Sequence, residues 1–159
     1  MADVHLRQGQ HGAAALPTLF DEVGGQPFFD ELCARFYDRV QQDEVLWPMY
    51  PHDDLEGAIR RLALFLGQFF GGPSAYSAER GHPRLRMRHF PFHVNQEARE
   101  HWLEHMTAAV DEMAPAPIHR VQMLDYFDRA SAALVNTLEP TPPVGERGPK
   151  SDPDLGVLQ

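Results

Sequence analysis

Apolar residues recur at intervals of three and four along most of this chain, which is the spacing of one face of an α-helix. The pattern is clearest over residues 55–69, where the apolar positions are Leu55, Ala58, Ile59, Leu62, Phe65, Leu66 and Phe69. Asp53 is a suitable N-cap for this helix, and Gly71-Gly72-Pro73 ends it. No segment alternates with a period of two for long enough to predict a sheet, so the sequence predicts an all-α fold.

Two helices are predicted before this segment. The first is short, covers residues 17–23 and stops at Gly24-Gly25, because paired glycines supply the backbone angles of a helix end. The second has Pro27 in its first turn. Its apolar stripe consists of Phe28, Leu32, Cys33, Phe36, Tyr37 and Val40.

Two further long helices are predicted in the second half of the chain. Asn95 caps the first, which ends at Pro115 and Pro117, and its stripe is Ala98, Trp102, Met106, Ala109 and Met113. The second is predicted to bury Ile118, Val121, Leu124, Phe127, Leu134 and Leu138. Pro91 limits any helix that carries His89 to a short one, since proline lacks a backbone donor.

The apolar content indicates a single domain. Hydrophobic residues make up 43% of the 159 positions, which is enough for one sizeable core, and we expect that core over residues 16–138. Residues 1–15 show no periodicity and are expected to form a flexible lead. Residues 139–159 contain five prolines and three glycines with few apolar side chains, so a disordered tail is expected there.

Charge and cysteine content narrow the expected partners and location. The 14 Lys and Arg residues against 23 Asp and Glu give a net charge of −9, which repels phosphate backbones, so no nucleic acid partner is expected. Cys33 is the single cysteine, which excludes an intramolecular disulfide, and no cysteine spacing indicates a zinc or iron-sulfur site. No apolar run has the length of a signal peptide or a membrane span, so we expect a cytoplasmic protein without membrane association.

The segment with the most specific chemistry is residues 80–92, RGHPRLRMRHFPF, in which His89 stands among arginines and aromatic residues. A neutral imidazole can bind haem iron, guanidinium groups can pair with the two haem propionates, and phenylalanine rings can face the macrocycle. Six of the 13 arginines gather at Arg60, Arg61, Arg80, Arg84, Arg86 and Arg88. The segment indicates the iron-binding side of a haem pocket; a histidine with a purely structural role is the ordinary alternative.

This segment, together with Arg35-Phe36-Tyr37, the Tyr50-Pro51 step and Trp102 thirteen residues after His89, resembles the truncated haemoglobins of group II. The resemblance spans residues 16–138. It implies a truncated globin fold, in which a two-over-two α-helical sandwich encloses haem b. It also implies that His89 is the iron ligand, with its other ring nitrogen held by a carbonyl or an acid.

The resemblance further implies three hydrogen-bond donors on the ligand-binding side of the haem, namely Tyr37, Tyr50 and Trp102. Ala58 matches the position where other globins often carry a histidine, and its methyl group cannot donate a hydrogen bond. Phenol and indole donors in a dry pocket stabilise an oxygen ligand that carries partial negative charge. Ordinary core packing is the alternative for each of the three aromatic residues.

Further contacts with the haem are assigned by the same resemblance. Arg61 and Arg88 are the first expected propionate partners, with Tyr76 as another. The residues expected against the ring are Leu62, Phe65, Phe90 and Phe92, with Met87 as a weaker candidate. Phe90 departs from the family pattern, because a smaller residue often precedes the Pro-Phe pair.

His101 and His105 are four residues apart on a predicted helix, a spacing at which two histidines can share a metal ion. The sequence HWLEH lacks the glutamate directly after the first histidine that a zinc protease motif needs, and it shows no third ligand. We therefore expect both histidines to be solvated. His82 and His93 are expected to be structural or exposed.

The expected function is reversible binding of oxygen and other diatomic ligands at ferrous haem. Three donors would hold oxygen too tightly for delivery, which favours conversion of nitric oxide to nitrate or reduction of peroxide. No flavin or nicotinamide fingerprint is present, so turnover needs an unidentified external electron donor, and enzymatic activity is left open. A stoichiometric oxygen or redox sensor and a helical protein without haem are the alternatives, and the resemblance alone makes a homodimer plausible.

Overall fold

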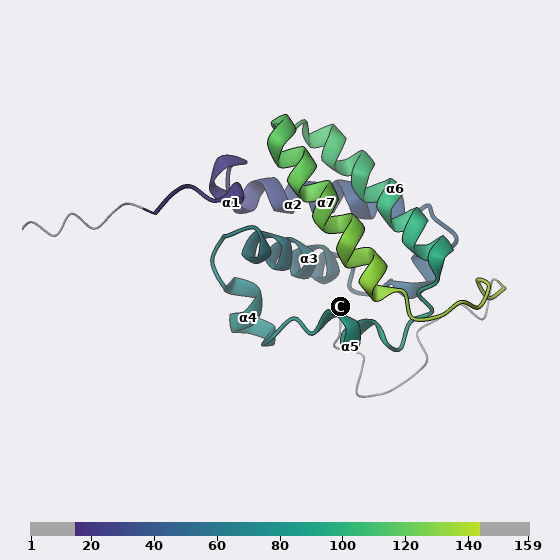
Figure 1. Ribbon diagram of the computed structural model, residues 1–159. Coiled ribbons are helices and arrows are strands. Elements are labelled where there is room, and N and C mark those ends of the chain that lie inside the picture. The colour runs from purple at the N-terminus through teal and green to yellow at the C-terminus, as the bar shows by residue number, and fades with distance from the viewer. Residues whose placement is uncertain (1–14, 144–159) are drawn as a thin grey trace, which may run out of the picture.

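The computed structural model describes residues 15–143, and within that range the chain forms α-helices and one short 3-10 helix without any β-strand (Figure 1). The predicted boundaries at residues 1–15 and 139–159 lie largely outside these residues and stay predictions. The elements in chain order are α1 (Leu19–Glu22), α2 (Gln26–Val40), η1 (Trp47–Met49), α3 (Leu55–Phe69), α4 (Ala75–Arg80), α5 (Leu85–His89), α6 (Gln96–Met113) and α7 (Pro117–Leu134).

The four long helices pack as two pairs, which confirms the predicted all-α, two-over-two architecture. Helix α2 packs against both α3 and α6, and α6 packs against α7. In Figure 1, α6 and α7 run side by side in front of α2, while the short helices α4 and α5 lie below α3. The short helices are held by fewer neighbours, since α4 packs on α3 and α5 on α7.

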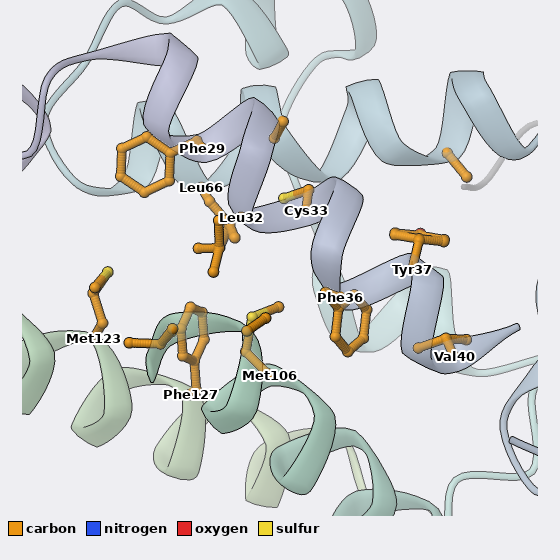
Figure 2. Close-up of a cluster of buried hydrophobic side chains, with 14 of the residues drawn as sticks. Phe29, Leu32, Cys33, Phe36, Tyr37, Val40, Leu66, Met106, Met123 and Phe127 are labelled. Atoms are coloured by element: carbon orange, nitrogen blue, oxygen red, sulfur yellow. The ribbon is translucent and has the colours of Figure 1, made fainter. Parts of the chain in front are cut away.

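The core lies between α2 and the α6–α7 pair (Figure 2). Its fully buried large side chains include Phe29, Leu32, Phe36, Met106, Met123 and Phe127. Cys33 is also in this core with no exposed surface. Burial raises the pKa of its thiol well above the usual value, and the Asp30 carboxylate acts in the same direction. The predicted stripe of the second helix is therefore the inward face of α2.

The starts of α2 and α6 agree with the predictions, whereas the start of α3 differs by one residue. Pro27 lies in the first turn of α2, and Asn95 caps α6 by accepting a hydrogen bond of 2.9 Å from the Ala98 N–H. The cap of α3 is Asp54 rather than Asp53, because the Asp54 carboxylate accepts from the Gly57 N–H. The prediction of Asp53 was thus wrong by one residue.

The buried face of α7 differs from the predicted one. Its buried residues are His119, Met123, Phe127 and Ser131, which follow one another at intervals of four. Ile118 and Val121 are exposed because they lie to the side of this line, and Leu138 is exposed because the helix has already ended at Leu134. The apolar spacing identified the helix but assigned part of its inward face wrongly.

Phe69 was predicted on the inward stripe of α3, yet it lies close to the surface with half of its area exposed. Its ring stacks on Tyr126 of α7, with ring centroids 3.7 Å apart. Phe69 thus packs on a side chain of α7 instead of entering the core.

Gly71, in the turn that ends α3, is expected to be sensitive to substitution. Its φ is +102°, and an added Cβ would lie 2.5 Å from Cβ of Thr18. Gly71→Ala should therefore lower the free energy of unfolding by about 2–4 kcal/mol, from backbone strain together with the steric clash. Gly24→Ala is the matched control, because its φ is +107° but nothing lies within 4 Å. Equal losses for the two variants in thermal melting would contradict the steric part.

Candidate functional site

A cavity opens among α2, α3, α5, α6 and α7, and it contains most of the residues predicted for the site. Its walls are mainly apolar side chains from α3, α5, α6 and α7. The lining residues that carry a polar group are Tyr37, Tyr50, Arg61, Tyr76, Arg88, His89, Arg99, Trp102, Tyr126 and Ser131. An apolar cavity with a small number of placed polar groups is typical of a cofactor site.

His89 lies at the end of α5 with one ring nitrogen fixed. Its Nδ1 donates a hydrogen bond of 2.7 Å to the carbonyl oxygen of Leu85, one turn earlier. Burial lowers the pKa of His89, and the bond to Leu85 opposes that shift only in part. The imidazole is therefore neutral, with Nδ1 protonated and Nε2 available as a metal ligand.

The segment that carries His89 is held by hydrogen bonds from two side chains, Arg88 within α5 and Asn136 outside it. Arg88 donates through Nε to the carbonyl of Pro83 at 2.7 Å and through Nη2 to that of Arg80 at 3.0 Å. Asn136, which follows α7, donates through Nδ2 to the carbonyls of His89 and Phe92. These bonds connect a five-residue helix to the residues just before it and to the distant segment after α7, and they fix the position of His89.

The three predicted donors lie together. The rings of Tyr37 and Tyr50 meet edge to face with centroids 5.3 Å apart, and Trp102 packs between Phe36 and Phe127. Burial raises the pKa of both phenols above the usual value. At Tyr50, a hydrogen bond from the Trp102 indole opposes part of that shift. Both tyrosines therefore stay protonated and can donate hydrogen bonds into the cavity.

The structure places four of the residues predicted against the ring or at its edge in the cavity wall: Leu62, Phe65, Phe92 and Tyr76. The prediction was wrong for Met87 and Phe90, which are 56% and 81% exposed and line a separate depression between α5 and α7. Helix geometry explains the difference, because a single turn that directs Leu85 and His89 inward directs Met87 and Phe90 outward.

Basic side chains border the cavity at three points. Arg61 donates to Asp54 at 2.8 Å, while its Nε is buried without a hydrogen-bond partner among the residues the structure describes. Arg88 is occupied by the carbonyls named above, and its guanidinium lies over the Tyr76 ring. Arg99 of α6, which sequence reasoning missed, donates to Asp128 and Ser131 of α7. Its position three residues before Trp102, on the same helix face, was the available signal.

These residues fit a haem group. A neutral histidine offers Nε2 on one wall, and apolar side chains form much of the rest of the lining. The phenol and indole donors come from the end of α2, the residue after η1 and the first half of α6. The buried Nε of Arg61, which has no hydrogen-bond partner among the described residues, offers a donor for a carboxylate at the cavity edge. A globin-like helical sandwich around haem is thus the class of protein that the fold and the cavity define.

Comparison with known proteins agrees with this class. A family model described as bacterial-like globin matches residues 18–136. A group 2 truncated haemoglobin of Bacillus subtilis is 40% identical over 118 residues, which cover 74% of this chain and 89% of that protein. The two-on-two haemoglobin-3 of Arabidopsis thaliana is 38% identical over 121 residues, which cover 74% of this chain and 69% of that protein.

Solved structures show the same relationship. A thermostable haemoglobin from Thermobifida fusca is 50% identical and aligns with 77% of this chain and 100% of its own, with a TM-score of 0.75. A truncated haemoglobin from Bacillus subtilis, described as oxygen-avid, is 32% identical and aligns with 76% of this chain and 100% of its own, with a TM-score of 0.71. The chain belongs to the truncated haemoglobins of group II.

Membership of this family establishes haem as the cofactor and oxygen and other diatomic molecules as its ligands. Between residues 15 and 143, no helix is long and apolar enough to cross a membrane.

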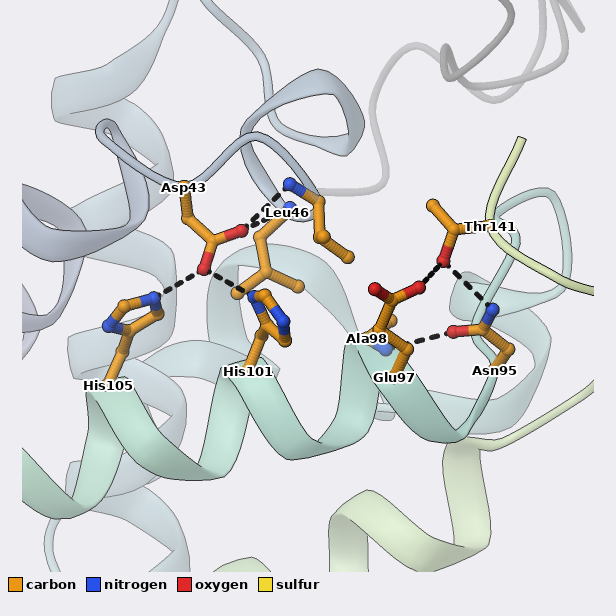
Figure 3. Close-up of polar contacts among 9 residues, drawn as sticks. Asp43, Leu46, Asn95, Glu97, Ala98, His101, His105 and Thr141 are labelled. Atoms are coloured by element: carbon orange, nitrogen blue, oxygen red, sulfur yellow. Dashed lines mark hydrogen bonds and ion pairs between the residues drawn. The ribbon is translucent and has the colours of Figure 1, made fainter. Parts of the chain in front are cut away.

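The histidines outside the cavity differ in part from the expectation. His82 accepts a hydrogen bond from the Arg84 N–H, and a ring nitrogen of His93 bonds to the carbonyl of Glu139, so both are structural as predicted. His101 and His105 are not simply solvated, because both contact the carboxylate of Asp43 (Figure 3). The correction comes from a residue 58 positions before His101, which helix spacing cannot reveal.

Asp43 itself is nearly buried, and its charge is strongly stabilised. Burial would raise the pKa of its carboxyl. Hydrogen bonds from His105, His101 and the backbone N–H groups of Leu46 and Val45 outweigh that effect and hold the pKa at about 2. Asp43 therefore joins the loop after α2 to α6 through His101 and His105.

Proposed function

We propose that this chain binds haem b through His89 and retains oxygen with hydrogen bonds from Tyr37, Tyr50 and Trp102, so that the oxygen is used in redox chemistry instead of being delivered. The reactions proposed are conversion of nitric oxide to nitrate and reduction of peroxide. When bound, haem b supplies the iron at which these small molecules react.

The observation that carries this proposal is the gathering of three donors in one apolar cavity. Tyr37 and Tyr50 are in edge contact, and Trp102 hydrogen-bonds to the Tyr50 hydroxyl. Donors that are already oriented in a dry site stabilise a ligand with partial negative charge without reorganisation. Slow oxygen release is the expected consequence, and the B. subtilis relative described as oxygen-avid supports it.

Two residues would orient the cofactor. His89 presents Nε2 because Leu85 holds the proton on Nδ1, and Arg61 offers its unpartnered Nε to a propionate. Arg88 serves chiefly to secure the α5 segment, since two of its nitrogens are bonded to carbonyls. Tyr76 and Arg88, which both line the cavity, are the partners proposed for the other propionate.

Turnover also needs an electron supply. One nitric oxide, one oxygen molecule and one electron give one nitrate, so each cycle consumes one electron from an external donor. That donor, a homodimer and a cytoplasmic location stay predictions.

The test is repeated addition of nitric oxide to the oxygen-equilibrated protein in the presence of NADPH and a general flavoprotein reductase. We expect nitrate to form in step with nitric oxide over at least ten additions per haem. Consumption that stops after one equivalent would contradict catalysis and favour a stoichiometric sensor. The reductase without the globin is the control for background consumption.

A further inference from the structure

A second cluster of potential metal ligands lies between α6 and the loop after α2, and none of its residues lines the cavity (Figure 3). Oδ2 of Asp43 lies 2.8 Å from Nδ1 of His101 and 2.6 Å from Nε2 of His105. The two histidines share one helix face because they are four residues apart. All three ligand atoms lie within 4.8 Å of one another.

We propose that Asp43, His101 and His105 bind a divalent transition-metal ion of the zinc type. Two imidazole nitrogens and one carboxylate oxygen are a ligand set that zinc accepts in three-ligand sites, with water at the remaining position. Ligand atoms of tetrahedral zinc lie roughly 3.3 Å apart, given bonds of about 2.0 Å. The two oxygen–nitrogen contacts therefore need to open by well under one ångström.

The carboxylate is already oriented for this role. Oδ1 of Asp43 accepts hydrogen bonds from the backbone N–H groups of Val45 at 2.8 Å and Leu46 at 3.0 Å. These bonds occupy one oxygen and direct the other toward the two imidazoles (Figure 3). Outer hydrogen bonds of this kind commonly orient metal ligands in proteins.

The site reaches solvent on the side of its two histidines. The Asp43 side chain is 6% exposed, whereas His101 and His105 are 37% and 18% exposed. An ion can therefore enter past the imidazole edges and keep water ligands on that side. The net charge of −9 favours the approach of cations.

The second ring nitrogen of His105 limits the expected affinity for the metal ion. Nδ1 of His105 is buried and has no hydrogen-bond partner in the part of the chain that the structure describes. A metal on Nε2 requires the proton on Nδ1, where it would have no acceptor, and the loss of such a partner typically costs 10–100-fold in metal affinity. We therefore expect micromolar binding that is readily reversible, in contrast to the fully supported His89.

The position of the ion would connect it to the haem cavity. Trp102 lies between the two histidines on α6, and the loop held by Asp43 leads through η1 to Tyr50. An ion at this site would hold together the two segments that supply these donors. We therefore expect a bound ion to alter oxygen release, an expectation that rests on the proposed function. Binding of the ion itself does not depend on that function.

The test is calorimetric titration of zinc chloride into tag-free, full-length, haem-loaded protein at pH 7.5. We expect one site per chain with a dissociation constant of roughly 1–50 µM. Asp43→Asn should weaken binding at least 30-fold, and the His101→Gln/His105→Gln double variant should abolish it. His82→Gln is the control, since this exposed histidine lies outside the cluster, and it should bind zinc like the parent.

Location and folding are checked separately. Zinc-edge anomalous diffraction from crystals of the haem-loaded protein should place one peak among the three side chains. An unchanged haem absorption spectrum would show that the variants are folded, and the exposed position of His101 makes His101→Gln the safest single change. No saturable site in the parent, or unchanged affinity in folded double-variant protein, would overturn the proposal. Neither result depends on nitric oxide turnover.

Discussion

Replacement of His89 by glycine is expected to remove the bond that holds the haem iron and to raise the rate of haem loss at least 100-fold. No other histidine lines the cavity between residues 15 and 143, so no imidazole can take its place. Removal of only an outer hydrogen-bond partner of a metal ligand typically lowers metal affinity 10–100-fold, and removal of the ligand itself should have a larger effect. Visible spectra with and without carbon monoxide, together with haem transfer to a scavenging apoglobin, would measure the effect.

The glycine variant also allows a rescue experiment. Removal of the side chain leaves space beside Leu85, and millimolar imidazole should restore the spectrum by supplying the missing nitrogen. His93→Gln is the control, because His93 lies outside the cavity wall and bonds to Glu139. An unchanged spectrum in the glycine variant would show that another residue is the iron ligand. A parent protein with no Soret band after haem is supplied would contradict haem binding altogether.

The second large effect is expected at the donors. Hydrogen bonds to charged groups contribute about 1.5–3 kcal/mol, so loss of one donor should accelerate oxygen release by about 10- to 100-fold. Trp102→Leu should release oxygen faster by this factor, and Tyr37→Phe should do likewise. The Tyr50→Phe variant loses both its own donor and the acceptor for Trp102, so its effect should not add to that of Trp102→Leu.

Stopped-flow mixing of the oxygen-equilibrated protein with carbon monoxide and dithionite would give these release rates. Tyr126→Phe is the matched control, because this tyrosine also lines the cavity but stacks on Phe69 instead of joining the Tyr37–Tyr50 pair. Very fast release by the parent, with similar rates in Tyr37→Phe and Trp102→Leu, would contradict retention of oxygen. Delivery of oxygen would then be the better interpretation.

Apolar periodicity and proline positions were sufficient to predict most of the helices from the sequence. The periodicity of residues 55–69 predicts α3 because that helix has one broad apolar face, and Pro91 correctly limits α5 to a short helix. The inward face of α7 was harder to assign, because both of its sides carry apolar residues and packing on α6 selects the line through Met123 and Phe127. Periodicity thus identifies helices more reliably than their orientation.

The parts of the site that were missed depend on contacts between distant residues. Asn136 secures the carbonyl of His89 across 47 positions, and Asp43 meets His101 across 58. Such partners have no fixed spacing, so no local signal indicates them. Met87 and Phe90 were misplaced for the opposite reason. Both are close to His89 in sequence, but the helical turn directs their side chains away from the cavity.

The burial of Cys33 has a consequence for self-association. It is the single cysteine of the chain, and its thiol has no exposed surface and a raised pKa. Thiolate is the form that exchanges with disulfides or reacts with oxidants, so this sulfur is inert while the core stays closed. Two folded copies can therefore associate only through reversible contacts, and any dimer must follow mass action, dissociating on dilution whatever the redox conditions.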